Sequence, residues 1–415
     1  MAQPEIEYRK VVIIGAGPSG ALAAALLTRH GHDVLIIERQ RFPRFSIGES
    51  LLSHCVDFLK EADMLAAVEA GGFQRKNGAA FTWGEKRSHF DFRDTFTPSA
   101  GWTFQVQRAH FDQILADEAE RQGAEIRYEE EIIAADMNDA EPCLTVKRPD
   151  GSQYRLRTAF VMDASGYGRV LPRLLDLEAP SNFPVRQAVF THLEDRIDPA
   201  DFDRDKILIT THPVHRDVWF WSIPFADGRL SLGVVAAKER YEGRSEDLTE
   251  CLQSFVAETP SLSHVLRHAV WDTPARQLGG YSANVKQLHG PGYALLGNAA
   301  EFLDPVFSSG VTIAMRSASM ASAVLHRQLS GEPVDWTKEF ALPLKQGVDT
   351  FRAYVEGWYD GSLQDVIYYQ NATPAIRRMI SSILAGYAWD ETNPYVNEPK
   401  RRLRVLAELC ATASA

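Results

Sequence analysis

The most constraining feature of the sequence is a glycine-rich turn near the N-terminus, Gly15-Ala16-Gly17-Pro18-Ser19-Gly20. It follows the wholly apolar residues 11–14, which are typical of a strand buried on both faces. Residues 21–27 are rich in Ala and Leu and favour a helix, which Gly31 can end, and residues 33–38 indicate a second strand. The order strand, glycine turn, helix and strand predicts a βαβ unit with a parallel sheet.

Within this unit, the spacing Gly15-x-Gly17-x-x-Gly20 is the dinucleotide-binding fingerprint. The first glycine permits a tight turn, the second lets backbone N–H groups approach a pyrophosphate, and the third packs the helix on the strand. Glu38 ends the second strand, where a carboxylate suits an adenosine ribose. The alternative is a glycine-rich turn without a nucleotide, but the ordered context favours binding at Gly15, Gly17, Ser19, Gly20 and Glu38.

Composition and charge exclude several classes of protein. The 415 residues allow two or three domains, and 45% hydrophobic and 24% charged residues are typical of a globular chain. Because 44 Lys and Arg oppose 55 Asp and Glu, the net charge of -11 argues against a nucleic-acid partner. Four cysteines without a CxxC pair predict no disulfide framework and no metal site. No signal peptide or membrane span is visible, so we expect a cytoplasmic protein.

Further segments resemble, in order, the FAD-contact segments of the flavoprotein monooxygenase superfamily. They are residues 105–112, Asp163-Ala164-Ser165-Gly166, Gly297-Asn298-Ala299-Ala300 and Asp304-Pro305. With the fingerprint, they span most of the chain. The resemblance implies FAD as the cofactor, with further contacts from Arg39, Ser50, Arg108, Asp163, Asn298, Asp304, Gly310 and Val311. Asn298 stands where the family usually has Asp, so we expect altered affinity rather than lost binding.

The remaining patterns, read with this resemblance, predict an α/β fold. A Rossmann-like FAD-binding domain is expected to interleave with an antiparallel-sheet substrate domain, followed by a helical C-terminal region. Residues 144–147 and 154–157 flank a Pro-Asp-Gly turn and indicate a hairpin. The expected boundaries are 1–75, 105–180 and 280–335 for the FAD-binding domain, 76–104 and 181–279 for the substrate domain, and 336–415 for the helical region.

Three features resemble the flavin-dependent halogenases within that superfamily. The first is the signature W-x-W-x-I-P, formed here by Trp219, Trp221, Ile223 and Pro224. Alternating aromatics also suit one face of an ordinary sheet. The complete match implies a wall that keeps organic substrate away from the flavin.

The second feature is Lys76, within the segment 72–84. A lysine in a turn is ordinarily a solvated charge, but the flanking Gly-Phe and Trp83-Gly84 match the halogenase segment whose lysine lies between flavin and substrate. The resemblance makes Lys76 the catalytic residue that presents hypohalous acid, either by hydrogen bonding or as a haloamine. Burial would help by lowering its pKa.

The third feature is the segment 304–311. Backbone N–H groups before a helix N-terminus form an anion nest. By resemblance, the amides of Ser309 and Gly310 hold the halide, and Ser308 lies near Lys76. The alternative is a plain helix cap in which Ser309 satisfies free backbone donors.

These features lead to a specific functional prediction: an FADH2-dependent halogenase that uses O2 and chloride or bromide. A separate flavin reductase is expected to supply the reduced flavin. The segment 48–52 and Phe307 resemble halogenases of phenols, pyrroles and carrier-tethered acyl groups, including the aryl-polyene pigment type, rather than the tryptophan branch. Glu49 is a candidate for the base that takes the ring proton, although a structural role is equally compatible.

Two alternatives remain open from the sequence. A flavin monooxygenase or reductase would share every FAD segment, and a non-catalytic flavin-binding assembly partner would fit the Asn298 departure. A carrier-protein substrate is acidic and needs a local basic patch on this acidic chain. Candidates are Arg377-Arg378 and the cluster Lys400, Arg401, Arg402 and Arg404, although such runs more commonly solvate helix faces.

Overall fold

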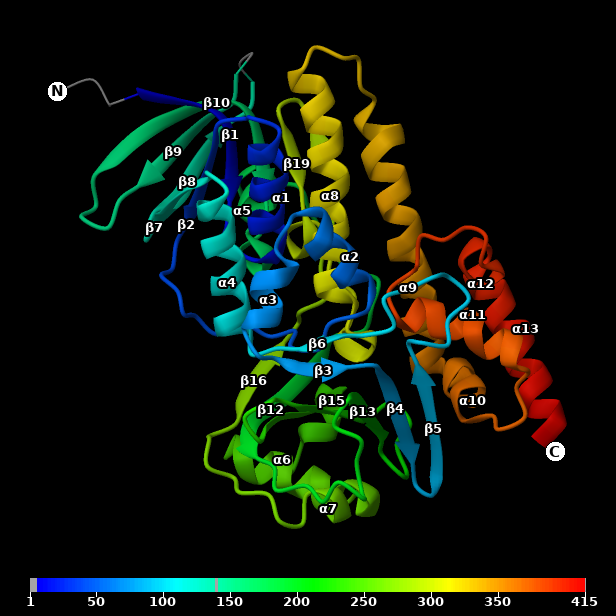
Figure 1. Cartoon of the computed structure of the whole chain (residues 1–415). Helices are drawn as coiled ribbons and strands as arrows, with labels where there is room; N and C mark the ends of the chain where they lie inside the picture. Colours follow the sequence, from blue (N-terminus) through cyan, green and yellow to red (C-terminus); the bar gives the residue numbers. More distant parts are fainter. Residues whose placement is uncertain (1–5, 139–140, 415) are drawn as a thin grey trace.

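The computed structural model describes residues 6–138 and 141–414, and two large sheets organise them (Figure 1). The first sheet has the strand order β18-β19-β10-β1-β2-β7, with β9 pairing β10 and β8 pairing β9. Strands β19, β10, β1, β2 and β7 are parallel neighbours, as the fingerprint unit predicts. The bounds are β1 Ile6–Ile14, β2 Val34–Glu38, β7 Glu125–Tyr128, β8 Glu131–Asp136, β9 Cys143–Lys147, β10 Gln153–Asp163, β18 His289–Gly290 and β19 Tyr293–Leu295.

Helices pack beside this sheet and bring the glycine turn to the edge of a cavity. Helix α1 (Pro18–Arg29) begins with a proline in its first turn and contacts both α4 (Arg108–Arg121) and α8 (Ser309–Leu329). A Cβ atom at Gly20 would lie 1.9 Å from the Gly15 carbonyl oxygen, so the third glycine of the fingerprint is required by packing. Shorter neighbouring elements are α2 His54–Glu61, α3 Leu65–Ala70 and α5 Val170–Leu174.

The second sheet has the order β16-β12-β15-β14-β13-β4-β5 and is antiparallel except where β13 pairs β4 in parallel. This parallel pair joins segments more than a hundred residues apart in the chain. Helices α6 (Leu248–Ala257) and α7 (Pro260–Val265) cover one face of the sheet with a separate apolar core (Figure 1). The bounds are β4 Gly78–Trp83, β5 Lys86–Asp91, β12 Arg186–Glu194, β13 Lys206–Thr211, β14 Trp219–Pro224, β15 Arg229–Ala237 and β16 Arg276–Gly279.

Two small pairs join these layers, and helices complete the chain. Strand β3 (Gln74–Lys76) pairs β6 (Thr103–Gln105), and β11 (Glu178–Ala179) pairs β17 (Asn284–Val285). The C-terminal helices pack beside β4 and β5 (Figure 1). Their bounds are α9 Leu342–Asp360, α10 Ser362–Tyr368, α11 Pro374–Leu384, α12 Pro394–Asn397 and α13 Pro399–Ser414.

The α/β fold class with a helical C-terminal region is therefore confirmed. The first sheet draws its strands from the segments predicted to bind the dinucleotide, although the domain boundaries themselves stay a prediction. Helix α8 begins at Ser309, within the segment 304–311 where the sequence predicts a helix N-terminus. In the described residues, none of the helices combines the length and the apolar character that crossing a bilayer requires.

Candidate active site

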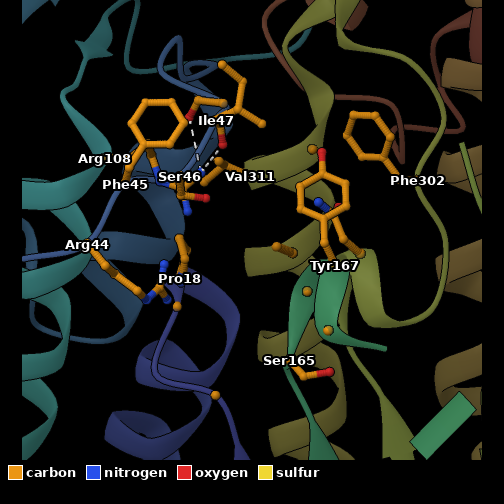
Figure 2. A pocket seen from close by; sticks show the side chains of 18 of the residues that line it. Pro18, Arg44, Phe45, Ser46, Ile47, Arg108, Ser165, Tyr167, Phe302 and Val311 are labelled. Atoms are coloured by element: carbon orange, nitrogen blue, oxygen red, sulfur yellow. Dashed lines mark hydrogen bonds between the residues drawn. The ribbon is translucent and has the colours of Figure 1, made fainter. Parts of the chain in front are cut away.

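A cavity of about 650 Å³ lies where elements of the two sheets meet. Its lining brings together most of the predicted residues: Gly15, Gly17, Ser19, Glu38, Arg39, Ser50, Arg108, Trp221, Ile223, Asn298, Ser308, Gly310 and Val311. Figure 2 shows Arg44 and Arg108 on one side of the cavity and Tyr167 and Phe302 on the other. The other predicted residues lie outside the lining: Gly20, Lys76, Asp163, Asp304, Trp219, Ser309 and Pro224.

The glycine turn fits a dinucleotide phosphate. Gly17 has an ordinary negative φ of -71°, and a Cβ atom there would meet only Arg44 Nη2, at 3.6 Å. Neither backbone conformation nor packing requires a glycine at this position, so its absent side chain leaves space at the N-terminus of α1. Gly15 differs, because its φ of +96° and the Ala164 carbonyl 2.8 Å from a Cβ both demand glycine.

Arg44 is a site residue that the sequence reasoning missed. Its Nη1 lies 3.4 Å from Asp112 Oδ2, and its Nη2 lies 3.7 Å from Glu38 Oε2. Its buried Nε has no hydrogen-bond partner among the described residues. A guanidinium beside Gly17 complements a pyrophosphate. The sequence did contain an indication of this role, because Arg39, Arg41 and Arg44 form a basic cluster directly after the second strand.

Two carboxylates hold the backbone around the cavity. Glu38 accepts hydrogen bonds from Ala16 N and Gln40 N, each at 2.9 Å, so it ties the glycine turn to the end of β2. Asp163 accepts from Ser165 N at 2.9 Å and from Leu171 N at 2.6 Å, and burial raises its pKa. The ribose contact of Glu38 stays a prediction. Both groups position backbone that lines the cavity.

Arg108 secures the segment that crosses the cavity. Its Nε and Nη2 donate to the two oxygens of Asp112, at 2.6 and 2.9 Å. Its Nη1 donates to the Ile47 carbonyl at 2.6 Å, a contact that is visible in Figure 2. The charge of Asp112 keeps the guanidinium protonated against the cost of burial. Residues 44–50 are thereby fixed across the opening.

The turn before α8 is built by Asp304. Its carboxylate accepts from Val306 N at 3.0 Å and from the Tyr359 hydroxyl at 2.8 Å, and burial raises its pKa to about 6. Ser308 follows in the left-handed region, with a φ of 55°, and α8 begins at Ser309. Ser308, not Ser309, is the N-cap residue of α8, and its side chain makes no capping hydrogen bond to any residue that the structure describes. The backbone N–H groups at the N-terminus of α8 lie beside the cavity, which Ser308 and Gly310 line.

Lys76 is buried rather than exposed in a turn. It ends β3, is 1% exposed, and its Nζ donates to Ser50 Oγ and to the Leu51 carbonyl, each at 2.8 Å. The ammonium also lies 5.2 Å from the centre of the Phe92 ring. Burial lowers the pKa of Lys76 to about 7. Because Ser50 both lines the cavity and contacts Lys76, it joins the two regions.

The two tryptophans of the W-x-W-x-I-P segment lie in different surroundings. Trp221 lines the cavity, and its Nε1 donates to Ser231 Oγ at 3.0 Å. Trp219 is fully buried, and its Nε1 donates to the Tyr359 hydroxyl at 3.0 Å. Tyr359 therefore connects Trp219 to Asp304. The role of the segment as a wall stays a prediction.

Comparison with known proteins agrees with this geometry. Residues 8–338 match the family described as the FAD binding domain. A crystal structure of a "flavoprotein/dehydrogenase" from Cytophaga hutchinsonii is 40% identical, with a TM-score of 0.95 over 99% of this chain and 100% of that one.

Two curated relatives are halogenases. A tryptophan 2-halogenase from Chondromyces crocatus is 30% identical over 78% of this chain, which spans 62% of that protein's length. A 1H-pyrrole-2-carbonyl-[peptidyl-carrier protein] brominase from Pseudoalteromonas luteoviolacea is 26% identical over 93% of this chain and 94% of that protein. The chain therefore belongs to the FAD binding domain family and, within it, to the flavin-dependent halogenases, which are FAD-using oxidoreductases.

Proposed function

We propose that this protein is an FADH2-dependent halogenase that transfers chlorine or bromine to an electron-rich aromatic ring. The carrying observation is Lys76, a cation buried to 1% exposure beside the cavity. Burial of an ammonium is costly unless it has a function or a charged partner. Among residues 6–138 and 141–414, the Lys76 ammonium contacts a hydroxyl, a carbonyl and an aromatic ring, and none of these is a carboxylate.

The residues of this chain have distinct proposed roles. Gly15, Gly17 and Arg44 hold the FAD pyrophosphate, and the N-terminus of α8, with the amides of Ser309 and Gly310, holds the halide. When bound, reduced FAD supplies the electrons with which O2 converts halide to hypohalous acid. Lys76 receives the hypohalous acid and orients it toward the ring. With a pKa of about 7, the amine is populated in both forms near neutral pH, so it can hydrogen-bond the oxidant or form a haloamine.

For the substrate, we propose a phenol or pyrrole, free or carried on a carrier protein. A relative named for a carrier-bound pyrrole aligns over most of both chains, which supports a tethered substrate. Exclusion of tryptophan stays a prediction, since another relative is named a tryptophan 2-halogenase. A separate flavin reductase is the proposed electron source. The proposed location is the cytoplasm, which agrees with four buried free cysteines.

The test is the mass of the product. The protein is incubated with FAD, NADH, a flavin reductase, bromide and a phenol or a carrier-bound phenolic acyl chain. Bromine's isotope pattern in the product is expected. If every aromatic substrate tested is recovered unchanged, with chloride as well as with bromide, the proposal is disproved.

A second candidate function is oxidation without halogen, because the relative at 40% identity is described as a flavoprotein/dehydrogenase. Such an enzyme would need the same FAD cavity but not Lys76. A gain of one oxygen or a loss of two hydrogens in the same assay, independent of halide, would identify it.

A further inference from the structure

Glu49 and His192 form an acid–imidazole pair at the cavity. His192 Nε2 lies 2.6 Å from Glu49 Oε1, a distance typical of a charge-assisted hydrogen bond. Glu49 lines the cavity and is 2% exposed. Its second oxygen, Oε2, has no hydrogen-bond partner within the described part of the chain. Leaving a buried polar atom without a partner lowers stability, so the pair calls for a role beyond packing.

The backbone separates Glu49 from Lys76. Val106 N donates to the Glu49 carbonyl at 2.7 Å, and Ser50 pairs with Gln105, which marks an extended segment. Neighbouring side chains in an extended segment point to opposite sides. Ser50 contacts Lys76, so Glu49 points away from the lysine. The sequence made Glu49 a candidate base for the proton that leaves the aromatic ring. That role would require this proton to lie on the side of the backbone opposite to Lys76.

His192 connects the pair to solvent. Its side chain is 24% exposed and lies on β12, with ring centres 5.2 Å from Phe225 and 6.2 Å from Phe45. Glu49 is nearly excluded from water, whereas the imidazole reaches it. The charged groups on the surrounding elements are Arg108 of α4, Lys76 of β3 beyond Ser50, Arg276 stacked on Phe45, and the Arg204–Asp195 pair beside Phe225.

We propose that Glu49 and His192 carry protons from solvent into the cavity. This inference rests on the proposed halogenase function. In that reaction, reduced FAD, O2, a halide ion, an aromatic C–H and one proton give FAD, the carbon–halogen bond and two waters. The proton has to enter from solvent, while the ring proton leaves on the Lys76 side. His192 takes up a proton from water and passes one through Nε2 to Glu49 Oε1, and Glu49 releases it to the cavity.

Proton linkage of FAD binding tests the pair without any turnover. Calorimetric titration of apoprotein with FAD, at pH 7 in phosphate and in Tris, measures the protons taken up, because the two buffers differ in ionisation enthalpy. FAD in the cavity removes the small remaining water contact of the 2% exposed Glu49, and complete burial disfavours the singly negative pair. We therefore expect uptake of a substantial fraction of one proton. Glu49→Gln and His192→Asn should each reduce it to near zero.

A matched control is available in the His212–Glu258 pair, whose Nε2 and Oε2 lie 3.3 Å apart and which lies outside the cavity lining. Glu258 also accepts hydrogen bonds from Arg244, at 2.8 and 2.9 Å. Glu258→Gln likewise removes a carboxylate that contacts an imidazole, and it should keep wild-type proton uptake. Equal uptake in the wild type and both site variants would overturn the proton route and leave the halogenase proposal standing. Failure of the wild type to bind FAD would instead remove the proposed function.

A product assay gives a second readout. Loss of a general acid typically costs about 100- to 10,000-fold in rate. Glu49→Gln loaded with FAD should lose halogenated product by about 100-fold at pH 8, and by less at pH 6, where protons are more abundant. A loss of the same size at both values would contradict proton delivery.

Discussion

The FAD cavity and the surroundings of Lys76 are built on different physical principles. The cavity, of about 650 Å³, is lined by backbone, polar and apolar groups from elements of both sheets. Lys76 is enclosed, with 1% of its surface exposed and the Phe92 ring beside its ammonium. A preformed cavity accepts a cofactor without rearrangement, whereas the enclosed lysine is kept from water, which would otherwise consume a reactive oxidant.

The two regions meet at Ser50, and each can be disturbed separately. Ser50 lines the cavity and accepts a hydrogen bond from Lys76. Substitutions on the cavity side should change FAD binding. Substitutions on the lysine side should change the product while FAD stays bound.

The largest effect is expected from Lys76→Ala. Halogenated product should fall by about 10,000-fold, the upper range for loss of an acid–base group, while FAD binding stays within a few-fold of wild type. Lys76→Arg should not restore activity, because a guanidinium stays protonated and cannot form a haloamine. The measurements are product mass and flavin fluorescence titration. Near wild-type halogenation in Lys76→Ala would disprove the assignment.

Gly17→Val disturbs the cavity side alone. The new side chain would occupy the space beside Arg44, where only one contact at 3.6 Å exists, so the fold should survive. The FAD dissociation constant should rise by about 1000-fold, equivalent to about 4 kcal/mol. Fluorescence titration of apoprotein measures it, and a thermal melt is the control for folding. Wild-type affinity in a folded variant would show that the turn does not hold the pyrophosphate.

The two tryptophans should respond differently. Trp219→Ala removes a fully buried ring and should lower the free energy of unfolding by about 3–5 kcal/mol. Trp221→Leu opens the cavity lining and should raise the hydroxylated fraction of the product or uncouple turnover. Chemical denaturation and product mass are measured for both variants. Identical changes in both readouts would mean that the segment acts only as core.

Stability should depend on pH through Lys76. Burial lowers its pKa from 10.5 to about 7, so between these values the unfolded chain binds a proton that the folded protein does not. The free energy of unfolding should therefore rise with pH, by up to about 1.4 kcal/mol per unit. The gain is absent below pH 7 and complete near pH 10.5. Comparing Lys76→Met with wild type by denaturation across this range isolates the effect, since Met has a similar shape without the charge.

The smallest effect concerns a carrier-bound substrate. Arg401, Arg402 and Arg404 are exposed on α13, and Arg401 makes an exposed ion pair with Glu398, at 3.3 Å. Reversing all three to Glu should raise the apparent KM for a carrier-bound substrate several-fold at low salt and leave a free phenol unaffected. Equal effects on both substrates would argue against docking through this helix.

Local patterns were sufficient to predict much of the fold. The glycine turn, the apolar strands 11–14 and 33–38, and the hairpin at 144–157 depend on short-range chemistry, and the structure contains them as β1, β2, β9 and β10. The parallel β13–β4 pair could not be predicted in this way, because it joins segments more than a hundred residues apart. Its formation depends on closing a long loop rather than on either strand's own sequence.

The candidate site likewise combines features that follow from local sequence with features that depend on contacts between distant segments. The cofactor fingerprint can be recognised from the amino acids alone, since the glycines act through backbone geometry that is local to them. The folded chain is needed to see that Lys76 is buried against Ser50, that Arg44 lies at Gly17, and that Glu49 meets His192. These side chains come from segments distant in the chain. Burial, charge partners and a lowered pKa are properties of that shared environment, and no single segment contains them.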